Sequence, residues 1–194
     1  MNDSLTTEQN PRRREIALAA RALIAEQGFE GLRTRDIAAR VGINIATLHY
    51  HVPGKAALVE LLAESLRDDF IAVQDRHPRR AMSPVERLRQ EFDDYIHIRR
   101  DKPQIHQVYG ELLIRAKRDA AVEAIMQPMT AHWHARIAGI FTDGVADGSF
   151  RAGTDPQAAA SIVIGALTWR GRSTAAPDVS VEQVANELMN AFAV

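Results

Sequence analysis

Cysteine is absent from the 194-residue chain, and this absence excludes disulfide bonds, thiolate zinc sites and cysteine nucleophiles. Long hydrophobic runs are absent too, since no stretch approaches the roughly 20 apolar residues that a membrane-spanning helix needs. The first residues, MNDSLTTEQNPRRR, lack the hydrophobic stretch that is typical of a secretory signal. The sequence therefore predicts a soluble, cytoplasmic protein that has no membrane partner.

Aromatic residues make up only 6% of the chain, but 46% of the residues are hydrophobic and 25% are charged. This composition is typical of a globular protein, and the length suits one large helical domain or two small ones. The formal net charge of −1 is unevenly distributed, since residues 1–58 carry +2 and the remainder carries −3. This asymmetry is too mild to indicate a nucleic-acid partner by itself.

Helical periodicity extends over almost the whole chain, so we predict an all-α fold. In the first segment, apolar residues recur at helical spacing from Ile16 to Ile24, and Gly28 is the expected C-terminal cap. A longer apolar stripe, from Leu58 to Val73, predicts a fourth helix.

Two short helices are predicted between these segments. Thr34 is expected to cap the first, which ends at Gly42, and Asn44 is expected to cap the second, IATLHYH (45–51). Such a pair, joined by a tight turn at a glycine, is typical of a helix-turn-helix motif, whose second helix enters the DNA major groove. We expect Leu48 to face the core. On spacing alone, an ordinary helical hairpin with a polar face is the alternative.

The stretch ALAARALIAEQGFEGLRTRDIAARVGINIATLHYHVPGKAALVELL (17–62) resembles the DNA-binding domain of the TetR (tetracycline-repressor) family of bacterial transcriptional regulators. The matching elements are an alanine-rich first helix, a glycine about six residues before Thr34, T-R-x-I-A-x-x-x-G, T-L-x-x-H-V and a lysine that opens the fourth helix. We therefore expect a flexible N-terminal arm (1–11), a three-helix DNA-binding domain (12–58) and a C-terminal regulatory and dimerisation domain (59–194).

In that family, the start of the second helix, the recognition helix and the lysine after it contact DNA. By position, the resemblance implies DNA contacts by Arg33, Thr34, Arg35, Ile45, Ala46, Thr47, His49, Tyr50, His51 and Lys55. The chain departs from the family pattern at one position: where a tyrosine typically follows T-L, it has His49, with Tyr50 next.

Two further basic features fit a DNA partner without requiring one. Lys55 opens a helix at the end of the dipole where a cation is unfavourable, unless a phosphate lies over that end. Arg12, Arg13 and Arg14 are expected to precede the first helix as a basic arm, and a solvated charge run is the alternative.

The C-terminal part is predicted to be helical from about 84 to 100, 104 to 117 and 120 to 146, followed by a turn-rich segment (147–156) and two last helices. We interpret the apolar faces of these two helices as a dimer interface that forms a four-helix bundle with its symmetry mate, and a buried pair within a monomer is the alternative. The interface residues are Ala158, Ile162, Gly165, Ala166, Trp169, Val181, Val184, Ala185, Leu188, Met189 and Phe192.

The central helices contain aromatic and soft residues that suit a pocket for a small, largely hydrophobic effector, although simple core packing is the alternative for each of them. These residues are Phe70, Tyr95, Ile98, His106, Tyr109, Leu113, Met126, Met129, Trp133 and Trp169.

Enzymatic motifs are missing. The His pairs in HYH (49–51) and HWH (132–134) lie two residues apart and point to different sides of a helix, so neither pair shares a metal ion. Asp93 or Asp94 with His97 has better spacing but supplies only two ligands. No nucleotide-binding loop or nucleophile elbow is present. We predict no enzyme activity, no metal and no cofactor.

Together these features predict a sequence-specific DNA-binding transcriptional regulator. We expect a repressor that binds a near-palindromic double-stranded DNA operator as a homodimer and is released by a small-molecule effector. The alternative is a helical small-molecule-binding or protein-interaction module that does not read DNA.

The departure at His49 gives a testable prediction. His49→Tyr is expected to preserve or strengthen operator binding, because a phenol donates a hydrogen bond to phosphate whatever the pH. The variant should also flatten the pH dependence of binding between about pH 6 and 8, where imidazole groups ordinarily titrate. Titration of operator DNA at several pH values measures both effects, and a severe loss of binding would show that the contact is misassigned.

Overall fold

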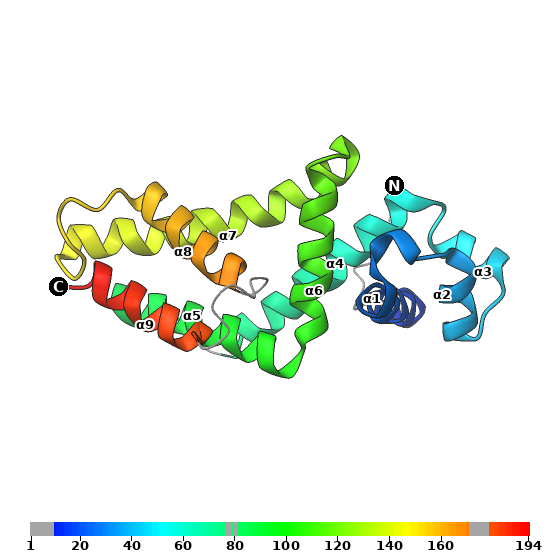
Figure 1. Ribbon diagram of the computed structural model, residues 1–194, viewed down its shortest axis with the longest axis horizontal. Helices are drawn as coiled ribbons and strands as arrows, with labels where there is room; N and C mark the ends of the chain where they lie inside the picture. Colours follow the sequence, from blue (N-terminus) through cyan, green and yellow to red (C-terminus); the bar gives the residue numbers. More distant parts are fainter. Residues whose placement is uncertain (1–9, 77–78, 80, 171–178) are drawn as a thin grey trace. The chain divides into compact units, whose positions relative to one another are not determined.

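The computed structural model describes residues 10–76, 79, 81–170 and 179–194, and within these ranges the chain forms nine α-helices (Figure 1). The helices are α1 (Pro11–Gly31), α2 (Thr34–Val41), α3 (Ile45–His51), α4 (Lys55–Gln74), α5 (Pro84–Asp101), α6 (Pro103–Ala116), α7 (Ala120–Asp147), α8 (Pro156–Arg170) and α9 (Val181–Phe192). The predicted all-α fold is confirmed. The β pairing in the described ranges is limited to one isolated bridge between Phe150 and Ala193.

The chain divides into two compact units. The first contains α1 to α4, α6 and the start of α7 up to Pro128, and the second contains α5, the rest of α7, α8 and α9. The sequence predicted a domain boundary between residues 58 and 59. In the structure both residues lie inside the continuous helix α4, and their side chains are buried. All of α4 therefore belongs to the first unit, together with α6, which packs against α1 and α4.

The start of α1 differs from the sequence prediction. The side chain of Asn10 accepts hydrogen bonds from the backbone N–H groups of Arg12 and Arg13, and Pro11 occupies the first helical position. Asparagine at the N-cap followed by proline favours a helix start, so the three arginines at 12–14 lie within α1 and not in an arm before it. Residues 1–9 of the expected arm lie outside the described residues.

Glycines and caps define the short helices. Gly28 interrupts the regular path of α1 with φ 74° and ψ 168°, as the sequence predicts for a helix end, before one more turn reaches Gly31. Gly42 closes α2 in the left-handed region, where a side chain would be strained. Asn44 caps α3 as predicted, since its side chain accepts a 2.7 Å hydrogen bond from the backbone N–H of Thr47. The prediction for Thr34 is wrong, because it is the first helical residue of α2.

In the second unit, α9 lies alongside α5 and contacts α8 (Figure 1). The core is built around Phe92, Phe141 and Phe150. Phe150 packs so closely on the backbone of α7 that a Cβ atom at Gly144 would lie 2.1 Å from its ring, so this position requires glycine.

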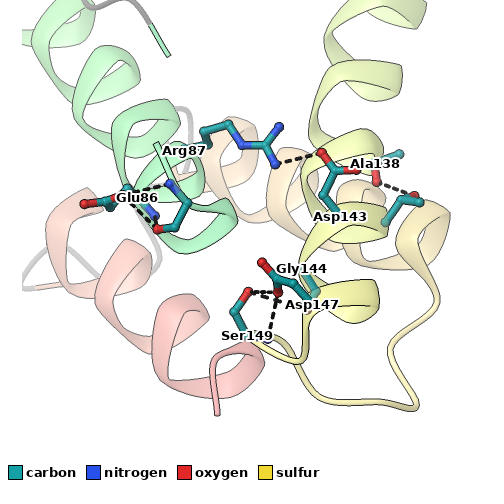
Figure 2. A network of polar contacts seen from close by, with 9 residues as sticks. Glu86, Arg87, Ala138, Asp143, Gly144, Asp147 and Ser149 are labelled. Carbon is teal, nitrogen blue, oxygen red and sulfur yellow. Dashed lines mark hydrogen bonds and ion pairs between the residues drawn. The ribbon is translucent and has the colours of Figure 1, made fainter. Parts of the chain in front are cut away.

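Polar contacts support the same unit (Figure 2). Arg87 of α5 donates a 2.7 Å hydrogen bond to Asp143 of α7. After α7, Asp147 accepts hydrogen bonds from the backbone N–H and the hydroxyl of Ser149, at 2.9 and 2.6 Å. The carbonyl of Gly144 accepts the backbone N–H of Phe150 at 2.9 Å, which fixes the turn that delivers this ring to the core.

A buried ion-pair network holds the first unit together. Arg21 of α1 is only 2% exposed and donates hydrogen bonds to Ser65 and Asp69 of α4, at 2.9 and 2.6 Å. Lys102, directly before α6, donates a 2.6 Å hydrogen bond to the other carboxylate oxygen of Asp69. Burial raises the pKa of Asp69, but the hydrogen bonds from Lys102 and Arg21 outweigh this effect and hold the pKa below the ordinary aspartate value.

Asp69→Asn is therefore expected to lower the free energy of unfolding by about 1–3 kcal/mol at pH 7, because two cations lose their carboxylate partner. An aspartate whose pKa is lowered in the folded state stabilises the fold above its unfolded pKa, and this stabilisation is lost as the pH falls through the folded pKa. The difference between the two proteins should thus shrink below about pH 4.

Urea unfolding at pH 7 and at pH 3 measures this difference. Glu60→Gln removes one carboxylate from the exposed side of α4 and serves as the control, with an expected change below about 0.5 kcal/mol. An Asp69→Asn effect that is equal at both pH values would contradict the account of the network.

Candidate nucleic-acid interface

Helix α3 has one buried residue, and its other residues are exposed or half-buried. Leu48 is 1% exposed and faces the core as predicted. Tyr50 is 84% exposed and Ile45 is 48% exposed, and Ala46 and His49 are exposed as well. Thr47 and His51 are half-buried. The sequence-predicted residues of α3 are thus all at least partly accessible.

Arg13 holds the end of this helix in place. Its guanidinium donates a 3.1 Å hydrogen bond to the backbone carbonyl of His51, the last residue of α3, and a second of 3.1 Å to Glu64 of α4. Sequence reasoning missed this role because it placed Arg13 in an arm. The Asn10-Pro11 pair is the signal that could have found it, since it places Arg13 inside α1.

Basic residues lie at the N-termini of the two helices that flank α3 in the sequence. Arg33 and Arg35 are exposed at the start of α2, and Lys55 is exposed at the start of α4. The N-caps of these helices, Arg33 and Gly54, make no side-chain hydrogen bond to the first turn. Uncapped N-H groups beside a cation form an arrangement that binds phosphate. The carboxylate of Asp36 lies 3.5 Å from the guanidinium of Arg35 and offsets part of the positive charge at the start of α2.

Phe29 lies beneath Lys55, a contact that the sequence analysis did not predict. The ammonium nitrogen of Lys55 is 5.4 Å from the ring centroid, and the guanidinium carbon of Arg115, in α6, is 5.5 Å from the same centroid. Both distances lie within the range of cation–π attraction.

The helix pair α2–α3, with its basic flanks, lies within the segment matched by a protein-family model. The model for bacterial regulatory proteins of the tetR family matches residues 16–62. Residues 16–62 are therefore similar to the DNA-binding domain of the tetR family. The resemblance that the sequence indicated is thereby confirmed, and the segment Arg33–Lys55 lies wholly within the match.

Curated transcriptional regulators resemble this chain over different lengths. UidR of Escherichia coli K12, an HTH-type transcriptional regulator, is 28% identical over 133 residues, which are 66% of this chain and 63% of UidR. The match thus spans less than two thirds of the length of UidR. The class D tetracycline repressor protein of Escherichia coli is 43% identical over 51 residues, which are 26% of this chain and 23% of the repressor.

The fold is shared over nearly the whole chain with solved structures. A transcriptional regulator from Saccharomonospora viridis in complex with choline has a TM-score of 0.78 and 23% identity, with 93% of this chain and 94% of that chain covered. At this identity the likeness shows the fold alone.

The predicted dimer residues separate into two groups. In α8, Ala158, Ile162, Gly165 and Trp169 are exposed and recur at helical spacing, and Trp169 is 56% exposed. A Cβ atom at Gly165 would meet no atom within 4 Å. Ala166 is half-buried. This α8 stripe (Ala158, Ile162, Gly165 and Trp169) is therefore open to a partner.

The α9 residues differ from the prediction. Val181, Ala185 and Met189 are buried in the core of the second unit, because this face of α9 packs within the chain. Leu188 and Phe192 are half-buried at the edge of the same core, and Val184 is half-buried. The α8 stripe is therefore the part of the predicted interface whose residues are exposed.

The predicted effector residues are distributed over both units. The first unit contains Phe70, whose ring lies 6.3 Å from that of His106 and 6.0 Å from that of Tyr109. Leu113 and Met126 belong to the same unit, the former half-buried and the latter buried.

In the second unit, the rings of Tyr95 and Trp133 are stacked with centroids 6.3 Å apart, and the Tyr95 hydroxyl donates to the carbonyl of Leu167. Ile98 is buried, Met129 is half-buried and, as noted, Trp169 is exposed on α8. The ten candidates thus divide between the two units, and each unit contains one group of neighbouring aromatic rings.

The candidate metal ligands are engaged elsewhere. Asp94 pairs with Arg79 and accepts a 2.8 Å hydrogen bond from Gln90, whereas His97 lies 3.3 Å from Asp101. No group of three or more metal-ligating side chains occurs among the residues that the structure describes. Within those same residues, no helix has both the length and the apolar character to cross a membrane.

Beside Asp94 lies a second buried carboxylate. Glu91 pairs with Arg79 and accepts a 2.6 Å hydrogen bond from Arg136 of α7. Burial raises the pKa of Glu91 in spite of the two guanidinium groups. The cluster joins α5 to α7 within the second unit.

Proposed function

We propose that the protein is a sequence-specific DNA-binding transcriptional regulator, a repressor that binds a near-palindromic operator as a homodimer in the cytoplasm. The observation that carries this proposal is the arrangement around α3: one buried leucine turns every other side chain of the helix to the surface or its edge, between two basic, uncapped helix starts. The same segment lies inside the tetR family match.

Each group in this arrangement has a distinct task in the proposed complex. Ile45, Ala46 and Thr47 lead α3 and are small or apolar enough to meet thymine methyl groups and base edges in the major groove. His49, Tyr50 and His51 follow on the same short helix and supply hydrogen-bonding groups for phosphates.

The two flanking helix starts would bind the DNA backbone. Arg33, Thr34 and Arg35 lie at the start of α2, and Lys55 lies at the start of α4. Cations beside unsatisfied backbone N–H groups attract phosphate and fix the orientation of the protein on the duplex.

A dimer would set the distance between the recognition helices of the two copies. The α8 stripe supports association with a second copy, because its small residues allow another helix to approach closely and its isoleucine and tryptophan offer apolar area. Two recognition helices about 34 Å apart would reach successive major grooves, and a two-fold axis requires two half-sites in inverted order.

An effector would act by favouring one of two spacings of the recognition helices. The two aromatic groups, around Phe70 and around Tyr95, support a small, largely hydrophobic molecule. A similarly folded regulator, from Saccharomonospora viridis, is known in complex with choline. A thermal-shift screen identifies the effector class, since a ligand that binds the folded state raises the unfolding temperature.

Lys55→Ala and Thr47→Ala test the DNA interface by gel-shift titration against the DNA that flanks the gene. Lys55→Ala is expected to weaken binding to all sequences and to reduce the slope of log K against log salt by about 0.9, the value for one lost phosphate contact. Thr47→Ala is expected to reduce the preference for the operator over random DNA, because it removes a group that faces the bases.

Arg89→Ala is the matched control for Lys55→Ala, since it removes one exposed positive charge from α5 in the second unit. It should leave the slope unchanged. If neither interface variant differed from the wild type, the chain would be better described as a helical binding module that does not read DNA.

Ile162→Glu tests the dimer. A charge in the centre of the α8 stripe is expected to convert the dimer to a monomer at micromolar concentration, because an unpaired carboxylate would be buried in the interface. Light scattering measures the mass, and Gln157→Glu adds the same charge at an exposed α8 position outside the stripe. A wild-type protein that is monomeric, or an Ile162→Glu variant that remains dimeric, would contradict this interface.

A further inference from the structure

Phe29 occupies a corner between three elements of the first unit. Gly28 breaks the regular path of α1 immediately before it, and the backbone N–H of Leu32 bonds to its carbonyl at 3.2 Å just ahead of α2. The side chain is 6% exposed, and Lys55 at the start of α4 lies over its ring. The break at Gly28 thus delivers an aromatic ring to the place where α4 begins.

Arg115 holds this ring from a third element. Its guanidinium lies 5.5 Å from the ring centroid, pairs with Glu30, the next residue in the chain, and lies 3.4 Å from Asp119. Because the end of α6 is tied to both Phe29 and Glu30, the orientation of the ring does not depend on α1 alone.

The partner of Lys55 differs in kind from the partners of three arginines in this unit. Arg12 pairs with Glu15, Arg13 with Glu64 and Arg40 with Glu26. No carboxylate forms an ion pair with Lys55 in the described ranges of the chain, and its ammonium group lies over the face of Phe29. A carboxylate would hold a lysine in place but would also cancel its charge, whereas an aromatic ring is neutral and leaves the full charge for a phosphate.

We propose that Phe29 is a positioning residue for DNA binding: its ring holds the Lys55 ammonium at the uncapped N-terminus of α4 without neutralising it. The inference rests on the proposed DNA-binding function and assigns the positioning role to a residue that does not itself touch DNA. A positioned lysine loses less side-chain freedom when it meets a phosphate, so the ring strengthens binding through Lys55 alone.

Phe29→Leu and Phe29→Tyr distinguish the effect of the aromatic face from that of an apolar side chain in this position. Leucine keeps an apolar side chain in the corner but removes the aromatic face, whereas tyrosine keeps the face. The probe is a 30-base-pair duplex of random sequence at low salt, since a phosphate contact does not depend on sequence. We expect Phe29→Leu to weaken binding by about 2- to 5-fold, the range that corresponds to one exposed cation–π contact, and Phe29→Tyr to bind as the wild type does.

A double-mutant cycle distinguishes positioning from a general effect on the fold. In a Lys55→Gln background, Phe29→Leu should cause no further loss of affinity, because the side chain that the ring positions is already gone. Ile24→Val is the matched core control: it trims a fully buried side chain of α1 and should lower thermal stability without changing DNA affinity. Thermal unfolding of every variant shows that each is folded at the assay temperature.

Two results would overturn the inference while leaving the proposed function intact. One is a Phe29→Leu variant that binds DNA as tightly as the wild type, and the other is an equal loss in the wild-type and Lys55→Gln backgrounds, which would indicate a purely structural role. If the wild-type protein formed no saturable, salt-dependent complex with any duplex, the proposed function would fail, and the inference with it.

Discussion

The burial of Leu48 is the constraint on which the proposed interface depends. Helix α3 has only seven residues, far below the length at which an isolated helix is stable in water. Leu48 is its one buried side chain, and the Asn44 cap and the Arg13 bond to His51 hold its two ends. Since so little of α3 is needed for packing, the rest of its surface is available to a partner.

The rest of the first unit supports this short helix through contacts between α1, α4 and the start of α6. Hydrogen bonds among Arg21, Ser65, Asp69 and Lys102, one of them buried and two partly buried, connect α1 to α4 and to the start of α6. Removing one partner of such a network leaves an uncompensated charge, so the loss of any one of these side chains is expected to destabilise the contact between the three elements. The two cations of this network, Arg21 and Lys102, are paired with the carboxylate of Asp69. Lys55, at the proposed DNA surface, instead lies over an aromatic ring.

Much of this arrangement could be predicted from the sequence because it depends on local signals. Asn44, Gly42 and Leu48 have the roles that capping preferences and periodicity assign to them. Thr34 was predicted as a cap because threonine is common there, but Arg33 occupies the cap and its side chain bonds to nothing in the first turn. Capping preference is weak enough for the surrounding chain to override it.

Contacts between distant residues could not be predicted in the same way. Arg13 and Glu64 are 51 residues apart, and Phe29 and Arg115 are 86 positions apart, so no periodicity connects either pair. The apolar stripe of α9 was predicted to face a partner chain, but its pattern cannot distinguish a partner chain from the protein's own core. The structure decides in favour of the core for Val181, Ala185 and Met189.

Hydroxyl-radical footprinting of the DNA that flanks the gene tests the central claim most directly, because it reports both the groove that is occupied and the spacing of the two recognition helices. Two protected half-sites in inverted order are expected on one face of the duplex, with centres about one helical turn or a small multiple of it apart. Uniform protection without defined half-sites, or no protection at low salt, would contradict that claim.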